Sequence, residues 1–132
     1  MLMDFSSCPC SGANLPRYLY PAILGVLAEA PRHGYLILKA VSDNGFFRNN
    51  PPDQTGLYRA LSRMEGDGLL QSGLTGGDVQ KKVYSLTQRG VHCLEEWIKT
   101  LTEHSVCLTE FIGFLHERAE QCREGREECR GE

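Results

Sequence analysis

The sequence predicts a mainly α-helical fold with a small β-hairpin and a long C-terminal helix. Three patterns predict it: three short segments with apolar residues at helical spacing, two β-type segments around a Gly-Gly-Asp turn, and a heptad-spaced apolar stripe near the C-terminus. Of the 132 residues, 41% are hydrophobic and 23% are charged, as in ordinary globular domains. One domain with its own hydrophobic core is therefore expected.

Two short helices are expected first, after an irregular arm over residues 1–16 that contains Ser, Gly, Asn and two prolines. In the first helix, Pro21 suits the first turn and Pro31 ends the helix. The second helix is predicted over the segment RHGYLILKAVSDNG, residues 32–45, where an Asn-Gly pair ends it. The expected apolar faces of the two helices consist of Ile23, Leu24, Leu27, Ala28, Leu36, Ile37, Ala40 and Val41.

A third helix is predicted after a loop over residues 46–53, in which two adjacent prolines block helix formation. Asp53 is a suitable N-cap for this helix, and Gly66 and Gly68 mark its end. Its apolar stripe consists of Leu57, Leu61 and Met64. The opposite side of this helix then carries Gln54, Thr55, Tyr58, Arg59, Ser62 and Arg63.

A β-hairpin is predicted from the segments LLQSGLT, at residues 69–75, and KKVYSLT, at residues 81–87. The turn between them contains Gly76, Gly77 and Asp78, which supply the positive φ that a tight hairpin needs. The last residue of the second segment, a threonine, is expected to cap the helix that follows.

A long helix is predicted from residue 89, because apolar positions are spaced alternately three and four residues apart and no proline interrupts them. It is either one helix or two helices with a bend near His104 and Ser105, and a polar tail at residues 123–132 is expected to fray. Its apolar stripe needs a partner, and a second copy of the chain is the simplest one. The residues expected to form a dimer over residues 89–122 are Val91, Leu94, Ile98, Leu101, Leu108, Ile112 and Leu115.

Three helices, a hairpin and a long helix form the winged helix-turn-helix arrangement, which assigns residues 17–88 to a DNA-binding domain. The segments LGVLAEAPRHGYLILKAV, TGLYRALSRMEGDGLLQS and KKVYSLTQRGVHCLEEWIKTL resemble the PadR family of bacterial transcriptional regulators. The resemblance runs from Pro21 to Leu101, and the opening CPCSG resembles a subgroup of the same family. It implies a DNA-binding regulator. In its HGY step, Gly34 is expected to allow close backbone packing.

The third helix is the predicted DNA-reading element, because its polar side fits a major groove and Arg59 and Arg63 lie one turn apart. Lys81 and Lys82 lie at the tip of the predicted wing, where phosphate contacts are expected. Adjacent strand residues face opposite ways, so only one of these lysines is expected to meet DNA directly. The alternative is an ordinary solvated polar face.

Charge is unevenly distributed along the chain. The net charge is −3, but residues 1–91 contain nine Lys and Arg against seven Asp and Glu, whereas residues 92–132 contain five against ten. The acidity is therefore confined to the C-terminal third, and the front part remains compatible with an anion-binding face.

Two features of the sequence are candidates for receiving a signal. Cys8, Cys10 and Cys93 can converge to bind a soft metal or metalloid, or to oxidise as a thiol switch. In the alternative interpretation, Cys8 and Cys10 belong to an irregular arm without a role in sensing, and Cys93 is a small buried apolar residue. No cofactor is required. Trp97 is expected to pack between the long helix and the first helix. The resemblance implies a second role for Trp97, stacking on a flat aromatic ligand.

The sequence therefore predicts a homodimeric transcriptional regulator, a repressor relieved by a small-molecule, thiol or metal signal, which binds double-stranded DNA at a roughly palindromic operator. One alternative is a winged-helix protein-interaction module that does not bind DNA. Another is a metal or redox sensor that acts through the three cysteines. No catalytic set is visible, so an enzyme is not expected. No signal peptide or membrane span is predicted, so the expected location is the cytoplasm.

Overall fold

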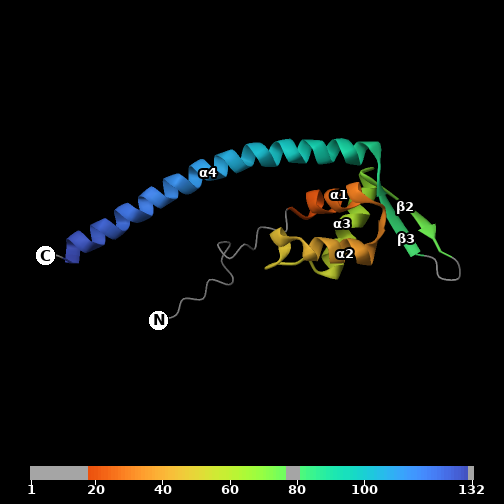
Figure 1. The fold of residues 1–132 in the computed structure, drawn as a ribbon, viewed down its shortest axis with the longest axis horizontal. Helices are drawn as coiled ribbons and strands as arrows, with labels where there is room; N and C mark the ends of the chain where they lie inside the picture. The colour runs from red at the N-terminus through yellow and green to blue at the C-terminus, as the bar shows by residue number, and fades with distance from the viewer. Residues whose placement is uncertain (1–17, 77–80, 131–132) are drawn as a thin grey trace. The chain divides into compact units, whose positions relative to one another are not determined.

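The computed structural model describes residues 18–76 and 81–130 (Figure 1). The chain divides into two compact units, the first ending at Glu95 and the second comprising the remainder of the chain. The elements, in chain order, are α1 Leu19–Glu29, β1 Arg32–His33, α2 Gly34–Asp43, the 3-10 helix η3 Gly45–Phe47, α3 Gln54–Gly66, β2 Leu70–Thr75, β3 Lys81–Leu86 and α4 Gln88–Arg130. The predicted fold class, three helices with a small sheet and a long C-terminal helix, is confirmed.

The core of the first unit lies between α1, α2, α3 and the sheet. As predicted, the third helix buries Leu57, Leu61 and Met64, and it buries Ala60 as well. Asp53 caps this helix, because its Oδ1 accepts a hydrogen bond from the backbone N–H of Gly56 at 2.9 Å. The fully buried large side chains are Ile23, Leu24, Ile37, Val41, Leu57, Leu61 and Met64.

The sheet has three strands in the order β1-β3-β2, all antiparallel. β2 and β3 form the predicted hairpin, in which Leu70 pairs with Leu86 and Thr75 with Lys81. The prediction missed β1 and wrongly began the second helix at residue 32. Arg32 and His33 are extended and pair with Tyr84 and Val83 of β3. A partner about fifty residues away dictates this conformation, so local sequence patterns do not reveal it.

Two further local expectations were wrong. Leu36 was placed on the buried face of α2 but is 42% exposed, because the buried side of α2 is a narrow line formed by Gly34, Ile37 and Val41. Ala28 is likewise exposed on α1. Within the segment predicted as a loop, η3 buries the ring of Phe47, which meets the ring of Phe46 edge-on at 5.2 Å between centroids.

Helix α4 is unbroken from Gln88 to Arg130, so of the two expected arrangements the structure has the single helix. It also continues through residues 123–130, where a frayed tail was expected. Glu and Arg, the commonest residues of this stretch, are good helix formers, and the stretch has no proline. Thr87 caps the helix as predicted, accepting a hydrogen bond from the Gly90 N–H at 3.0 Å. In the part of the chain that the structure describes, no helix has the length and apolar character that crossing a membrane requires.

Candidate functional site

The exposed side of α3 carries a continuous set of polar residues. Because Leu57, Ala60, Leu61 and Met64 face the core, the remaining side of the helix faces solvent. The structure places all six predicted residues on that exposed side: Gln54, Thr55, Tyr58, Arg59, Ser62 and Arg63. Their contact with DNA stays a prediction.

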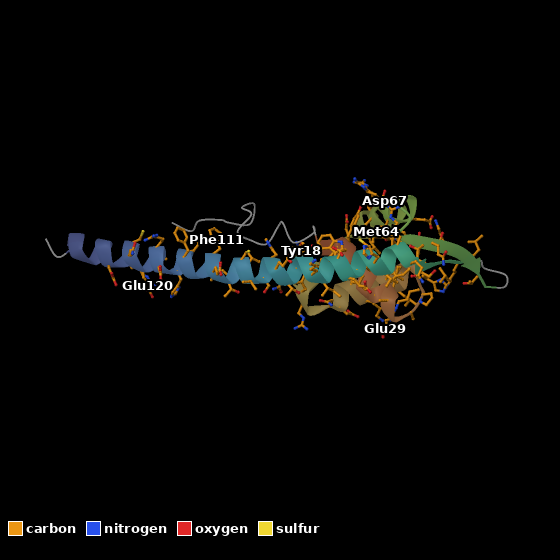
Figure 2. The ribbon with its side chains drawn as sticks, turned by 90° about the horizontal axis from the view of Figure 1, so that it is seen from above. Tyr18, Glu29, Met64, Asp67, Phe111 and Glu120 are labelled. Carbon is orange, nitrogen blue, oxygen red and sulfur yellow. The ribbon has the colours of Figure 1, made fainter. Side chains whose placement is uncertain are left out.

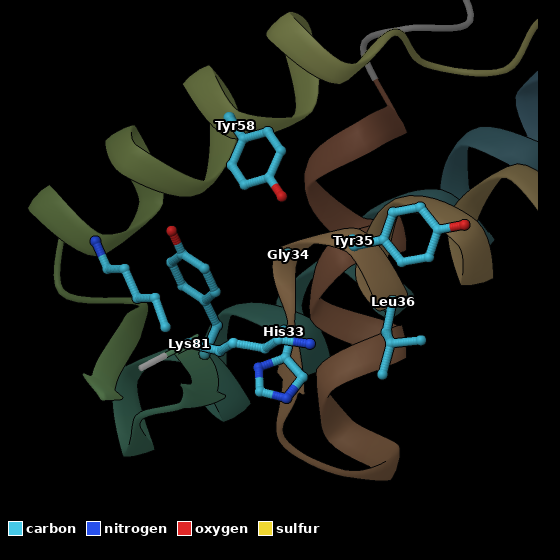
Figure 3. Close-up of a pocket in the computed structure, with 8 residues that line it drawn as sticks. His33, Gly34, Tyr35, Leu36, Tyr58 and Lys81 are labelled. Atoms are coloured by element: carbon cyan, nitrogen blue, oxygen red, sulfur yellow. The ribbon is translucent and has the colours of Figure 1, made fainter. Parts of the chain in front are cut away.

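Tyr58 links α3 to the start of α2. A Cβ atom added to Gly34 would lie 2.5 Å from Cε1 of Tyr58 and 2.7 Å from its hydroxyl oxygen, distances that real side chains do not adopt. Gly34 therefore permits the close approach expected of it, and its neighbour is the tyrosine ring (Figure 3). The sequence suggested the glycine's role, but it gave no signal that Tyr58 was the partner.

A pocket of about 570 Å³ opens between α2, α3 and the wing. His33 of β1 and residues 34–36 at the start of α2 form one wall, and Tyr58 of α3 forms another. Lys81, Lys82 and Tyr84 of β3 complete the pocket (Figure 3). The pocket thus combines basic groups, three tyrosines and apolar surface. It unites residues from both predicted DNA-contacting elements with the HGY step, which the sequence analysis had assigned only to packing.

The two wing lysines have different surroundings. The ammonium group of Lys82 lies 3.5 Å from Oε1 of Glu65 and 5.3 Å from the centre of the Tyr84 ring. Tyr84 and Glu65 raise the pKa of Lys82, so this lysine keeps its charge at neutral pH. Within the described residues, Lys81 forms no ion pair. Among the described residues, therefore, only Lys82 of the two lysines has a carboxylate partner.

The second unit exposes apolar side chains along α4. Of the predicted dimer residues, Leu94 and Leu101 are half-buried, whereas Val91, Ile98, Leu108, Ile112 and Leu115 are exposed. Phe111, beside this stripe, stacks on Phe114 with 6.3 Å between the ring centroids. The guanidinium group of Arg118 lies over the ring of Phe114, 5.0 Å from its centre. Figure 2 shows Phe111 and Glu120 projecting from opposite sides of α4. Pairing through this stripe stays a prediction.

The residues proposed to receive a signal are not brought together by the described structure. Cys93 is a half-buried free thiol and Trp97 is half-buried, whereas Cys8 and Cys10 lie outside the described residues. In residues 18–76 and 81–130, no three His, Cys, Asp or Glu side chains form a group that could hold a metal ion. Both the metal and the thiol hypotheses therefore stay untested.

Comparison with protein families finds one matching family model. Residues 23–96 match the transcriptional regulator PadR-like family. This stretch contains α1, α2, α3, all three strands and the beginning of α4. No curated protein matches the sequence.

Several solved structures are similar to this chain. A PadR-family regulator from Eggerthella lenta is 29% identical, with a TM-score of 0.62 and coverage of 80% of this chain and 88% of that one. A transcriptional regulator from Clostridium thermocellum is 22% identical, with a TM-score of 0.66 and coverage of 75% and 95%. Bacillus subtilis PadR, solved in complex with operator DNA, is 27% identical, with a TM-score of 0.56 and coverage of 62% and 47%.

The contact between Gly34 and Tyr58 can be tested by a double-mutant cycle. Gly34→Ala should lower the free energy of unfolding by up to about 1 kcal/mol, because the new methyl group overlaps the tyrosine ring and the exposed end of Tyr58 must move aside. In a Tyr58→Ala background the same substitution should cost little, since the ring is gone. Urea denaturation of the four proteins measures both values, and equal costs in the two backgrounds would contradict the assigned contact.

Proposed function

The chain belongs to the transcriptional regulator PadR-like family, and from this premise we propose that it is a homodimeric DNA-binding repressor. The observation that carries the proposal is the exposed polar side of α3, with arginines one turn apart, beside a wing that carries two lysines. The family consists of transcriptional regulators, so the expectation that the chain is not an enzyme is confirmed.

Helix α3 has the length and chemistry of a recognition helix. Its 13 residues can lie along a major groove, with Arg59 and Arg63 reaching guanine edges or phosphates. Gln54 and Thr55 lie in the first turn, where unpaired backbone N–H groups favour phosphate. Operator DNA in the solved complex of Bacillus subtilis PadR supports this assignment for a protein of the same fold.

The exposed stripe on α4 supports a dimer. Apolar side chains spaced alternately three and four residues apart suit a coiled-coil partner, and a second copy presents the same stripe. Two-fold symmetry then gives two recognition helices, which bind two half-sites of a roughly palindromic operator. Binding there represses transcription by occupying the DNA.

Release from DNA requires a signal that favours another dimer geometry by a few kcal/mol. We place its reception on α4, either through a flat small molecule at Trp97 or through a thiol or soft-metal event at Cys93 with Cys8 and Cys10. No cofactor is needed for DNA binding itself. Because its ligand is DNA, the protein acts in the cytoplasm.

Arg59→Ala and Arg63→Ala should each weaken DNA binding about tenfold or more, since each removes a charge from the groove-facing side of α3. Fluorescence anisotropy with duplexes selected from a random library by the wild-type protein measures the loss, and the affinity should fall steeply as salt rises. Lys99→Ala on α4 is the matched control and should bind normally. If neither arginine matters, the protein-interaction alternative is favoured.

The dimer proposal has a matched pair of substitutions on α4. Ile112, on the heptad stripe, is 61% exposed, and Val106, outside it, is 58% exposed. Ile112→Glu should produce monomers because it places charge in the paired seam, whereas Val106→Glu should leave the dimer intact. Sedimentation equilibrium reads the mass directly. A wild-type monomer, or equal behaviour of the two variants, argues against pairing through the stripe.

The thiol proposal predicts that Cys93→Ser removes any response of DNA binding to diamide or to soft metal ions. Cys107→Ser, on an exposed free cysteine of the same helix, is the control and should keep the response. The readout is the DNA affinity with and without each reagent, together with metal content after dialysis. A full response in Cys93→Ser removes this cysteine from the signal.

A further inference from the structure

We propose that Thr87 and Gly90 are positioning residues for DNA binding, which hold the C-terminal end of α3 at a fixed angle to the first turns of α4. The place where they meet Gly68 and Leu69 is named the α3–α4 junction, and it consists of these four residues. All four belong to the first unit. The inference rests on the proposed function, in which α3 contacts DNA and α4 pairs with a second copy.

Helix α3 ends in a tight turn that holds two backbone carbonyl groups in place. Gly68 has a φ of +80°, and its N–H group donates to the carbonyl oxygen of Glu65 at 3.0 Å. The N–H group of Leu69 donates to the carbonyl oxygen of Met64, also at 3.0 Å. These two bonds form a Schellman motif, in which glycine is favoured because of its positive φ. The carbonyl groups of Gly68 and Leu69 therefore follow any movement of the last turn of α3, which contains Arg63.

Thr87 connects these carbonyl groups to the start of α4. Its hydroxyl group donates to the carbonyl oxygen of Gly68 at 2.6 Å, and the carbonyl oxygen of Leu69 is a second, longer acceptor at 3.1 Å. The same hydroxyl oxygen accepts a hydrogen bond from the Gly90 N–H at 3.0 Å, and the N–H of Thr87 donates to Leu69 at 3.2 Å. Capping a helix needs only the acceptor. The donor side of Thr87 therefore has a second role, which is to join α4 to the end of α3.

Gly90 allows the two backbones to approach each other. It is buried, and a Cβ atom added to it would overlap the carbonyl oxygen of Leu69 and lie 3.2 Å from Cδ2 of Leu86. A backbone carbonyl cannot move aside as the end of a flexible side chain can, so glycine is required at this position. Any larger residue would push the first turn of α4 away from the end of α3.

In the proposed dimer, the α3–α4 junction sets the separation of the two recognition helices. The apolar stripe of α4 begins at Val91 and Leu94, directly after Gly90. When two stripes pair, the junction in each subunit transmits the direction of α4 to α3. Each base pair added between half-sites moves one of them by about 3.4 Å and turns it by roughly 35° around the duplex. A fixed junction therefore predicts a narrow preference for one spacing, whereas a loose junction lets each α3 follow its own half-site.

The experiment measures how the affinity of the full-length protein depends on half-site spacing. The duplexes carry two half-sites from operators that the wild-type protein selects from a random library, with base pairs inserted or removed between them. Fluorescence anisotropy gives the affinity at each spacing. Wild-type affinity should fall about tenfold or more when the spacing changes by a single base pair, because the duplex or the dimer must then be distorted.

Thr87→Asp separates helix capping from the junction, because a carboxylate accepts the Gly90 N–H but has no proton to donate to Gly68. Its preference for the best spacing over the neighbouring ones should fall by about two- to tenfold, as expected for one lost hydrogen bond. Thr87→Ser keeps the donor and should behave like the wild type. Thr102→Asp is the matched control and should keep the narrow preference, because the hydroxyl of Thr102 donates to Ile98 within α4 at 2.6 Å. An effect of charge alone lowers the affinity at every spacing by one common factor.

Hydrogen exchange tests the junction in the wild-type protein and needs no variant to fold. The N–H groups of Thr87 and Gly90 are the backbone donors of the junction. In a fixed junction they should exchange within about tenfold of the rate of the Leu61 N–H in the core of α3. If they exchange faster than that, as the N–H groups of a fraying helix end do, the junction is loose and the proposal is overturned.

The outcomes distinguish this inference from the proposed function. If the wild-type protein binds no duplex or is a monomer, the proposed function fails. If it binds as a dimer but tolerates changed spacing, or if Thr87→Asp keeps the narrow preference of the wild type, the assignment of the junction alone is overturned. The same holds if Thr87→Ser loses the preference as far as Thr87→Asp does, since the hydroxyl donor is then not the cause.

Discussion

The pairing of β1 with β3 is the interaction on which the proposed DNA-binding surface depends. Only two residues, Arg32 and His33, form β1, yet their ladder joins the start of α2 to the wing strand. Tyr58, resting on Gly34 at the same point, joins α3 to both. Three elements from separate parts of the chain therefore share one surface. A shift of one residue in the β1 register would turn the side chains of β1 to opposite faces.

Much of the fold could be predicted because its signals are local. The spacing of Leu57, Leu61 and Met64 defined both sides of α3, and Asp53 and Thr87 were recognisable as caps. β1 was missed because two residues carry no periodicity and their extended conformation comes from a distant partner. Leu36 was wrongly assigned to the buried face of α2 because it is apolar and adjacent in sequence to Ile37, which is buried. Only the packing of α2 against the core shows that Leu36 faces solvent.

The candidate site was predictable residue by residue but not as an arrangement. Sequence spacing placed the polar residues of α3 and the two lysines on exposed elements, and the structure agrees on their exposure. It could not show that Lys82 pairs with Glu65, because these residues belong to different elements and only the tertiary fold brings them within 3.5 Å. Nor could it show a pocket beside the HGY step, whose walls come from three elements.

Net charge is a poor guide to what this chain binds, because local pairing decides which charges act at a distance. In the first unit, Glu29 forms an ion pair with Arg32 at 2.8 Å and Glu65 forms one with Lys82, so two carboxylates are screened at close range. In the described part of that unit, Arg59, Arg63 and Lys81 form no ion pair. A phosphate near α3 therefore meets cations whose fields are not cancelled by a direct neighbour, even though the whole chain is acidic.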